Sequence, residues 1–269
     1  MTILFTEENH KYFIKEKPDF KFVSISGLIN LIKQEFDTKT EAKKYSEKGK
    51  DKILKDLIKK WGLSTEEAIT KWGHLEMTPE DIEAIWLEKK DTSLVKGTTH
   101  HVFREDQSIR FEGGYPILYD GDIKQAYPLR DLKPGLYPEL IIHNLEYGLI
   151  GTADRIKIYP DKTFEVFDYK TNQKIEFQGF KKYDKTLGFT VEQKLKRPVN
   201  HLSDSNGIKY TIQLSCYAYM LEQFGYTCKG LTLNHVILDD DGNLVNEIDY
   251  KLDYLKKEVV TLFNWFKKQ

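Results

Sequence analysis

Two aspartates and a lysine occupy unusual positions in the segment from residue 148 to residue 172, GLIGTADRIKIYPDKTFEVFDYKTN. Apolar residues alternate on either side of a turn at Pro160–Lys162, which predicts a β-hairpin. If the turn is a three-residue loop, Asp154 lies opposite Asp168, and Lys170 follows two residues later on the same face. Like charges opposite one another destabilise a sheet, and burial strengthens the repulsion. A compensating positive charge is therefore expected.

A third carboxylate extends this set to the preceding strand. A four-residue loop at Leu145–Gly148 places Glu139 opposite Asp154. Three carboxylates beside Lys170 offer the oxygen ligands that Mg²⁺ or Mn²⁺ prefers, for one ion or for two. Such a site suits the hydrolysis of a phosphodiester, in which the metal activates water and the ammonium orients it or stabilises charge. The alternative is an ordinary surface acid pair with a lysine salt bridge.

This reading depends on one face of the hairpin that is both apolar and acidic. Strict alternation predicts that the face consists of Ile150, Thr152, Asp154, Ile156, Ile158, Phe164, Val166, Asp168 and Lys170. A slip of one residue in the register would send the acids to opposite faces.

Helices and strands must hold these side chains, and the periodicity of the apolar residues predicts where they lie. A short hairpin is expected within 2–14, and Ser24 or Ser26 is expected to cap a helix at 27–36. Further helices are predicted at 39–61, 65–73, 79–90, 93–107, 208–225 and 252–267. Strands are predicted at 137–144, 149–159, 163–170, 231–238 and 243–250. The segment 108–136 is expected to be irregular or to form short strands, and no clear pattern is found in 171–207. This order indicates a mixed α/β (α+β) fold with a central sheet.

Length and composition restrict the class of protein. The chain has 269 residues, a net charge of −1 and 40% apolar residues, enough for a large packed core. No run of about 18 apolar residues occurs, so no membrane span is expected. Cys216 and Cys228 cannot by themselves build an iron–sulfur or zinc site, and reduced thiols favour the cytoplasm, of a bacterium or of a virus-infected host. We expect a hairpin and helical region at 1–92, packed on a core at 93–269.

Basic and aromatic residues are interleaved in the segment 174–197. Seven cations and three acids lie in this segment, with aromatic rings between them. The basic residues are Lys174, Lys181, Lys182, Lys185, Lys194, Lys196 and Arg197. This mixture suits the phosphates and exposed bases of DNA, and it is equally typical of a solvated loop.

Five short motifs, taken in order, resemble the PD-(D/E)XK nuclease superfamily in its RecB-like and phage exonuclease branch. The central pair is Gly151-Thr152-Ala153-Asp154 followed by Asp168-Tyr169-Lys170. Around it lie Gly97, His101 and Glu105 in KGTTHHVFRE, Glu139 in YPEL, and Gln213 and Tyr217 in QLSCY. The motifs span 97–219, and Ala153 stands where the family name has proline. The absence of a cysteine quartet sets the chain apart from the iron–sulfur members.

The resemblance implies a restriction-endonuclease-like core with a helical N-terminal extension, and a role for each matched residue. The implied metal ligands are His101, Glu139, Asp154, Asp168 and the carbonyl of Tyr169. The implied catalytic residues are Asp154, Asp168, Lys170, Glu139, Gln213 and Tyr217, of which the last two would hold Lys170 or a DNA phosphate. Judged by spacing alone, the pairs His101–Glu105 and Gln213–Tyr217 could also be ordinary surface or packing pairs.

The leading hypothesis is therefore a Mg²⁺- or Mn²⁺-dependent deoxyribonuclease, and an exonuclease that acts on DNA ends in recombination or repair is favoured. The resemblance implies DNA as the partner, together with a single-strand-binding or annealing protein. Two alternatives are a structure-specific endonuclease and a non-catalytic nucleic-acid-binding module on the same scaffold.

Overall fold

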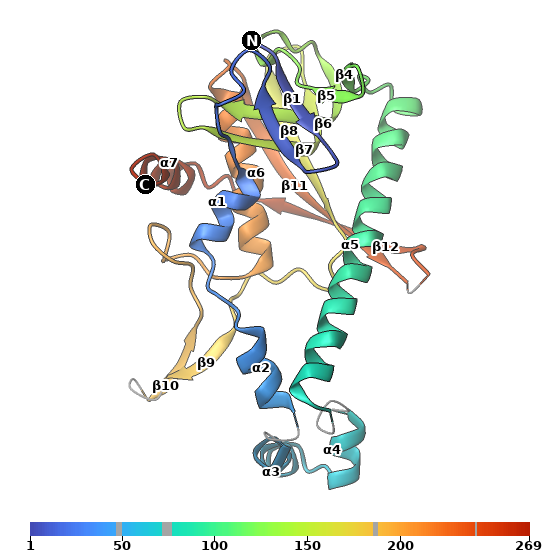
Figure 1. Cartoon of the computed structure of the whole chain (residues 1–269), viewed down its shortest axis with the longest axis vertical. Helices are drawn as coiled ribbons and strands as arrows, with labels where there is room; N and C mark the ends of the chain where they lie inside the picture. Colours follow the sequence, from blue (N-terminus) through green and yellow to red (C-terminus); the bar gives the residue numbers. More distant parts are fainter. Residues whose placement is uncertain (47–49, 72–76, 185–187, 240) are drawn as a thin grey trace. The chain divides into compact units, whose positions relative to one another are not determined.

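The computed structural model describes residues 1–46, 50–71, 77–184, 188–239 and 241–269 (Figure 1). The chain forms two compact units, Glu35–Lys96 and a larger unit made of Met1–Gln34 with Gly97–Gln269. The smaller unit contains α2 (Thr38–Tyr45), α3 (Lys50–Trp61), α4 (Thr65–Lys71) and the first part of α5 (Pro79–Arg110). The expected division at 1–92 and 93–269 stays a prediction. Along the described part of the chain, no helix is both long and apolar enough to cross a membrane.

A mixed six-stranded sheet forms the centre of the larger unit. Its strands are β3 (Val23–Ser24), β6 (Gly135–Asn144), β7 (Leu149–Ile158), β8 (Thr163–Lys170), β11 (Thr227–Leu238) and β12 (Leu244–Leu252). β8 is parallel to β11 and β3 to β7, and the other neighbours are antiparallel. Because β6 pairs with β7 along its whole length, β8 and β3 share the other edge of β7. The predicted mixed α/β fold is confirmed, and it is consistent with a restriction-endonuclease-like core.

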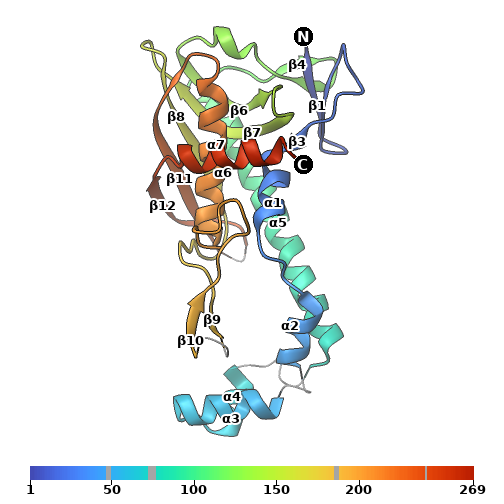
Figure 2. The same cartoon turned by 90° about the vertical axis from the view of Figure 1, so that its left-hand side faces the viewer.

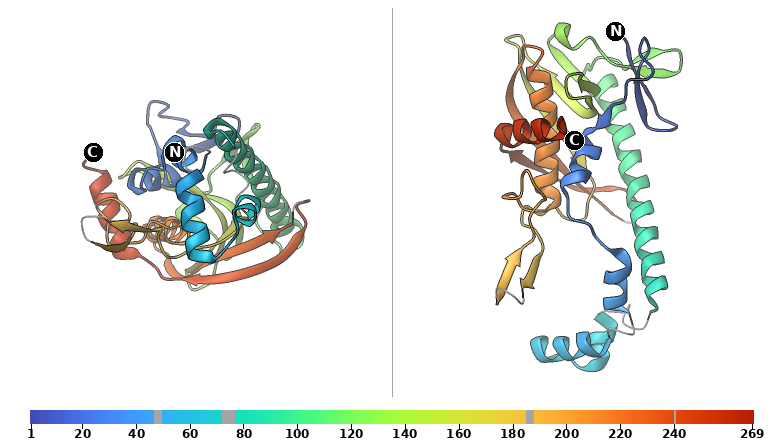
Figure 3. Two further views of the ribbon diagram at one scale, coloured as in Figure 1. Left: turned by 90° about the horizontal axis from the view of Figure 1, so that it is seen from below. Right: turned by 60° about the vertical axis from the view of Figure 1, so that its left-hand side comes forward.

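Helices flank this sheet. α6 (Asn206–Glu222) makes the crossover between the parallel strands β8 and β11 and packs on the sheet. α7 (Lys256–Phe266) crosses α6 (Figure 2), and α1 (Ile25–Ile32) lies beside α6 (Figure 3). Ser24, one of the two predicted caps, begins α1: its Oγ accepts a hydrogen bond from the Gly27 N–H at 3.0 Å.

The last turns of α5 are fixed to the sheet by Arg104. The guanidinium lies over the ring of Tyr169, 5.2 Å from its centroid, and forms an ion pair with Glu247 of β12. His100, one turn earlier, accepts a hydrogen bond from Arg104 Nε at 3.3 Å, and its ring meets Tyr169 edge-on. These contacts set the position from which His101, the next residue, reaches the sheet.

A second, four-stranded sheet packs against the β6–β7 pair. It consists of β1 (Ile3–Thr6), β2 (Lys11–Ile14), β4 (Leu118–Asp120) and β5 (Ile123–Gln125), in the order β2-β1-β5-β4. The predicted N-terminal hairpin is confirmed, and β4, β5 and the 3-10 helix η3 (Leu129–Asp131) lie in the segment expected to be irregular or to form short strands. Ile3, Phe5 and Ile14 pack with Ile141 and Ile150 of the main sheet. The hairpin therefore belongs to the larger unit.

Three predicted segments differ from the structure. The helix predicted at 39–61 is two helices, α2 and α3, and 47–49 lie outside the described residues. The helices predicted at 79–90 and 93–107 are one helix, α5, because no proline or glycine separates them. The segment 171–207 contains a two-stranded ribbon of β9 (Lys181–Asp184) and β10 (Phe189–Glu192).

Substitution of Gly151 tests the packing of α6 on β7. A Cβ atom at Gly151 would lie 2.7 Å from the Tyr217 ring, so the ring or the helix would have to move. We expect Gly151→Ala to lower the free energy of unfolding by about 1–3 kcal/mol, measured by urea denaturation. Gly230→Ala in β11 is the matched control, because its nearest contact would be an ordinary 3.4 Å. Equal losses in the two variants would contradict the prediction.

Candidate active site

The strands β7 and β8 separate at Asp154 and Asp168, and we call this point the fork. The predicted register between β7 and β8 is confirmed, and the described ladder ends at Arg155, opposite Phe167. Further along, β3 takes the same edge of β7 at residues 149 and 150. The backbone N–H of Tyr169 donates to Asp154 Oδ2 at 2.8 Å, so a side chain replaces the neighbouring strand as the acceptor. The two strands thus separate where the aspartates lie.

Glu139 lies at a backbone irregularity in β6. The predicted register is confirmed, because Glu139 falls between the pairs Pro138–Arg155 and Leu140–Ala153. Its φ angle is 48°, in the left-handed region, which a residue with a side chain occupies at a cost of about 1–3 kcal/mol. Strain of this kind is concentrated at functional sites, and the apolar pattern of the sequence gives no sign of it.

Side-chain alternation changes on both strands at this point. Ala153 and Ile156 of β7 both pack into the main apolar cluster, as do Tyr137 and Leu140 of β6. In a regular strand, residues three apart face opposite sides of the sheet. The expectation of one unbroken apolar and acidic face is therefore wrong: the acids lie where both strands change face.

Three of the predicted metal ligands come together at the fork. Ligand atoms of His101, Glu139 and Asp154 all lie within 4.8 Å of one another, the one such group among the described residues. His101 belongs to α5, and its Nδ1 lies 3.4 Å from Asp154 Oδ2. All three side chains line a cavity of about 480 Å³ that residues of both sheets, α5 and α6 share. This group could hold a metal ion, whose identity the side chains do not fix.

Asp168 and Lys170 form a buried ion pair next to this group. The Asp168 side chain is 1% exposed, and its Oδ2 lies 2.5 Å from Lys170 Nζ. The other carboxylate oxygen, Oδ1, is buried and has no hydrogen-bond partner among the described residues. Lys170 Nζ also donates to the carbonyl of Tyr169 at 3.3 Å, so this predicted metal ligand is engaged by the lysine. Asp168 and Tyr169 thus stand beside the three-residue group and not within it.

Burial raises the pKa of all three carboxyl groups, and repulsion from Asp154 adds to it at Glu139 and Asp168. Burial, and then Asp154, raise the pKa of Glu139 to about 8, and burial raises the pKa of Asp154. Burial, and then Asp154, raise the pKa of Asp168 to about 6. Burial alone would lower the pKa of Lys170, but Asp168 and Asp154 outweigh it and raise this pKa. One ammonium therefore leaves the carboxylates short of positive charge.

The residues present fit a divalent cation. Burial, and then Lys170, lower the pKa of His101, which keeps its imidazole in the neutral form that binds metals. The unpartnered Oδ1 of Asp168 and the raised pKa values at Glu139 and Asp154 are what a missing positive charge would produce. A donor set of carboxylates with one imidazole suits several divalent ions, Mg²⁺ and Mn²⁺ among them.

Residues of α6 complete the wall of the cavity. Gln213 Nε2 donates to Tyr217 Oη at 3.1 Å, and both predicted residues line the same cavity as the metal-ligand group. Lys170 lies against another residue of α6: its ammonium is 5.0 Å from the ring centroid of Tyr210. Tyr210 Oη in turn donates to Asn172 Oδ1 at 2.6 Å. The sequence analysis missed Tyr210, although it lies on the same helix as Gln213, three residues earlier.

The second sheet contributes residues that the sequence analysis missed altogether. Tyr12 of β2 hydrogen-bonds through its Oη to Thr152 Oγ1 at 2.9 Å. Lys124 of β5 lines the cavity together with Glu105, the residue one turn after His101 on α5. Both come from strands that meet β7 only through long-range packing, and no local pattern could reveal them.

The predicted DNA-binding residues are spread over the connection between β8 and α6. Lys174, Lys181, Lys182 and Arg197 are exposed, and Lys196 is half-buried. Lys194 pairs with Glu192 at 2.7 Å, and Lys185 lies outside the described residues. The pairing of β9 with β10 puts Lys182 on one face of the ribbon with Phe180 and Phe189, which are 70% and 56% exposed. This face offers one cation between two open aromatic rings.

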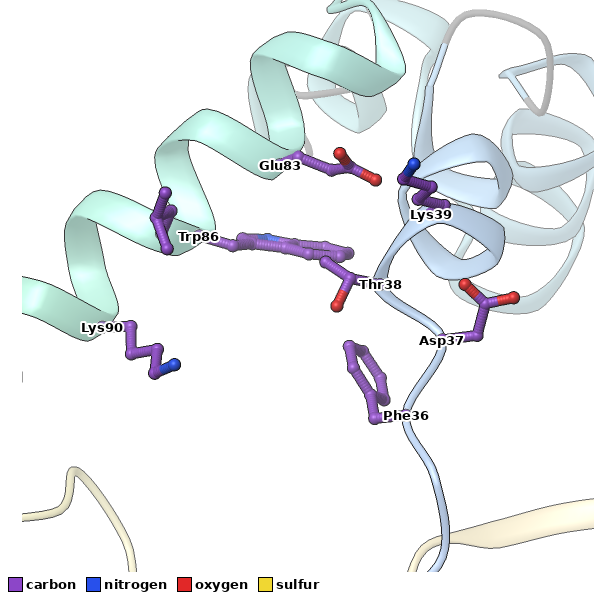
Figure 4. Close-up of a pocket in the computed structure, with 8 residues that line it drawn as sticks. Phe36, Asp37, Thr38, Lys39, Glu83, Trp86 and Lys90 are labelled. Atoms are coloured by element: carbon purple, nitrogen blue, oxygen red, sulfur yellow. The ribbon is translucent and has the colours of Figure 1, made fainter.

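The smaller unit has a hollow of its own, shown in Figure 4. Its volume is about 680 Å³, and it lies between the start of α2 and the first part of α5. Phe36 and Trp86 form its apolar wall, with ring centroids 6.2 Å apart. Lys39 and Glu83 point toward each other across it (Figure 4). These side chains bring together no set suited to catalysis.

Comparisons with known proteins do not establish a function for this chain. No family model and no curated protein matches the chain. Among solved structures, the chain is similar to a protein from Eubacterium rectale described as "Putative exonuclease", with a TM-score of 0.36 and 12% identity. The match covers 98% of this chain and 86% of that one. A likeness of this strength carries no argument about function.

The repulsion at the fork predicts how stability depends on pH. A carboxyl group whose pKa is higher in the folded state holds its proton longer there, so the metal-free protein loses stability as pH rises from about 4.5 to 8. We expect Asp154→Asn to remove part of this loss. The stability of the variant relative to wild type should be higher at pH 8 than at pH 5 by about 1 kcal/mol, which corresponds to roughly 2–4 °C in the unfolding temperature measured in EDTA.

Glu8→Gln, which changes an exposed acid in the N-terminal turn, is the control. Its unfolding temperature should equal that of wild type at both pH values. If Asp154→Asn and wild type differ by the same amount at pH 5 and pH 8, the buried repulsion is absent.

Proposed function

We propose that this protein is a metal-dependent nuclease that hydrolyses phosphodiester bonds in DNA, and that it acts as an exonuclease on DNA ends. The observation that carries the proposal is the group of His101, Glu139 and Asp154 beside the buried pair of Asp168 and Lys170. This arrangement has a place for a divalent cation and an ammonium next to it, as the cleavage of a polyanion requires. The order of the motifs along the chain supports the RecB-like branch and therefore DNA ends as the substrate.

A divalent cation would be held by His101, Glu139 and Asp154, with Asp168 and the Tyr169 carbonyl as further proposed ligands. When bound, it supplies positive charge to the phosphate and lowers the pKa of a water molecule. Mg²⁺ or Mn²⁺ is proposed because carboxylates dominate the site.

Lys170 would act as a cation and not as a general base. Its ammonium is held by Asp168 at 2.5 Å and lies against the Tyr210 ring. Its raised pKa keeps the amine protonated, and a protonated amine cannot accept a proton from water. It would orient the attacking water and stabilise the charge that develops on the phosphate.

Gln213 and Tyr217 would contact the phosphate from α6. Burial raises the pKa of the Tyr217 phenol well above its usual value, so the hydroxyl stays protonated and can donate a hydrogen bond. The Gln213 amide fixes this hydroxyl in the cavity. Both residues would therefore position substrate.

The basic connection after β8 would bind the DNA backbone. It begins directly after Lys170, so its cations and the proposed catalytic lysine lie on one continuous segment. Lys174, Lys181, Lys182 and Arg197 are exposed and available to phosphates. Phe180 and Phe189 could stack with unpaired bases. A single-strand-binding or annealing protein as partner and a cytoplasmic location stay predictions.

Removal of Lys170's charge tests the proposal directly. Wild type should degrade labelled linear DNA with Mg²⁺ or Mn²⁺ and stop in EDTA. Lys170→Met and Asp168→Asn should each reduce the rate by about 100-fold or more, because the first removes the positive charge at the reacting phosphate and the second removes the carboxylate that holds that charge in place. Lys157→Met, at an exposed lysine of β7, is the matched control and should cut at the wild-type rate. No cleavage by wild type in either metal would end the proposal.

A circular single-stranded substrate in the same assay separates the two kinds of nuclease. An exonuclease leaves the circle intact, whereas an endonuclease opens it. Opening of the circle would replace the exonuclease by a structure-specific endonuclease while leaving the metal-dependent chemistry in place.

The contribution of the ribbon is measured by the salt dependence of DNA binding. Lys181→Ala with Lys182→Ala should weaken binding and lower the slope of log K against log salt by about 0.7–0.9 for each phosphate that the protein no longer neutralises. Fluorescence anisotropy in EDTA measures both effects without cleavage. The control pair Lys257→Ala and Lys268→Ala, two exposed lysines near the C-terminus, should leave the slope unchanged. Equal slopes in both pairs would remove the ribbon from the DNA interface.

A further inference from the structure

A second half-buried lysine lies in the candidate active site. The Lys124 side chain on β5 is 13% exposed, and its Nζ lies 2.8 Å from Glu7 Oε1 and 3.6 Å from Glu105 Oε2. Burial alone would lower its pKa, but Glu7, Glu105 and Glu139 outweigh burial and raise it. Lys124 therefore stays charged in a cavity where an isolated ammonium would be costly.

Lys124 shares its cavity with the proposed metal ligands. Glu105 and His101 are one turn apart on α5, so both side chains project to the same side of the helix. His101 meets Asp154, whereas Glu105 meets Lys124. Glu139 influences both centres, because it belongs to the metal-ligand group and also raises the pKa of Lys124.

This arrangement has the form of a two-cation site in which one cation is part of the chain. Two-metal hydrolases hold their ions about 3.5–4 Å apart, with a carboxylate bridging them. Here Glu139 lines the same cavity as Lys124 and Glu105, and the carboxylates of Glu105 and Glu7 lie against the ammonium. An ammonium in that position supplies positive charge that a second ion would otherwise supply.

We propose that the Lys124 ammonium takes the place of a second metal ion, so that the active site binds a single divalent cation at His101, Glu139 and Asp154. The proposal rests on the proposed function to the extent that a divalent cation must bind at all. Lys124 is then a positioning residue for Glu139 and Glu105, and a fixed positive charge near the reacting phosphate.

A simpler role for Lys124 is an ion pair that ties β5 to the N-terminal hairpin. Glu7 is 68% exposed, and exposed ion pairs contribute only about 0–1 kcal/mol to stability. Lys15 provides the comparison, since it pairs with Asp120 in the same sheet but does not line the cavity. If the only role of Lys124 were to hold two strands together, variants at Lys124 and at Lys15 would bind the same number of metal ions.

The test is the number of Mn²⁺ ions bound per chain, measured by calorimetry and by electron paramagnetic resonance of free Mn²⁺. We expect one ion in wild type, one in Lys124→Arg and Lys15→Met, and two in Lys124→Met, since Glu105 and Glu139 are then free to bind a second ion. Lys124→Met with Glu105→Gln should return to one ion. This double variant also removes one of the acids left unpaired, so it is the safer variant to fold.

Two results would overturn the inference: two ions of similar affinity in wild type, or one ion of unchanged affinity in Lys124→Met. Wild-type stoichiometry alone decides the matter if Lys124→Met does not fold. Asp154→Asn should bind no Mn²⁺ at this site, which identifies the ion counted. Wild type that binds no ion at all would instead defeat the metal-dependent nuclease itself.

Discussion

Repulsion between buried carboxylates at the fork is the constraint on which the arrangement around the site depends. Glu139, Asp154 and Asp168 lie on three neighbouring strands, and each has its pKa raised by burial. One pKa unit corresponds to about 1.4 kcal/mol, so the charged form of the site is unfavourable without compensation. Lys170, Lys124 and the Tyr169 N–H are the compensating groups that the chain itself supplies. The neutral imidazole of His101 leaves the remaining deficit for a metal ion.

The architecture supplies each of these groups from a different element. β7 and β8 diverge at the aspartates, and β3 pairs with the edge of β7 that β8 leaves. α5, fixed to the sheet through Arg104, brings His101 and Glu105 from one side. α6 places Tyr210, Gln213 and Tyr217 at spacings of three and four residues, which put all three on one face of the helix. Long-range packing thus positions side chains that no single element could assemble.

The centre of the site could be predicted because short loops fix the register of neighbouring strands. The loops Leu145–Gly148 and Pro160–Lys162 set the positions of Glu139 and Asp168 relative to Asp154, and both registers are confirmed. The change of face at these acids could not be predicted, since it depends on a left-handed backbone at a residue that rarely adopts one. The position of Lys124 could not be predicted either, because β5 pairs with β1, a strand more than 100 residues earlier in the chain.

The left-handed conformation of Glu139 is unfavourable for the stability of the fold, although its carboxylate belongs to the candidate site. A glycine at this position would adopt the same φ without strain and would remove a buried acid, so the folded chain would gain stability twice over. The same change would take a carboxylate away from both cation centres. At position 139, therefore, what would stabilise the scaffold and what the proposed site requires call for different residues.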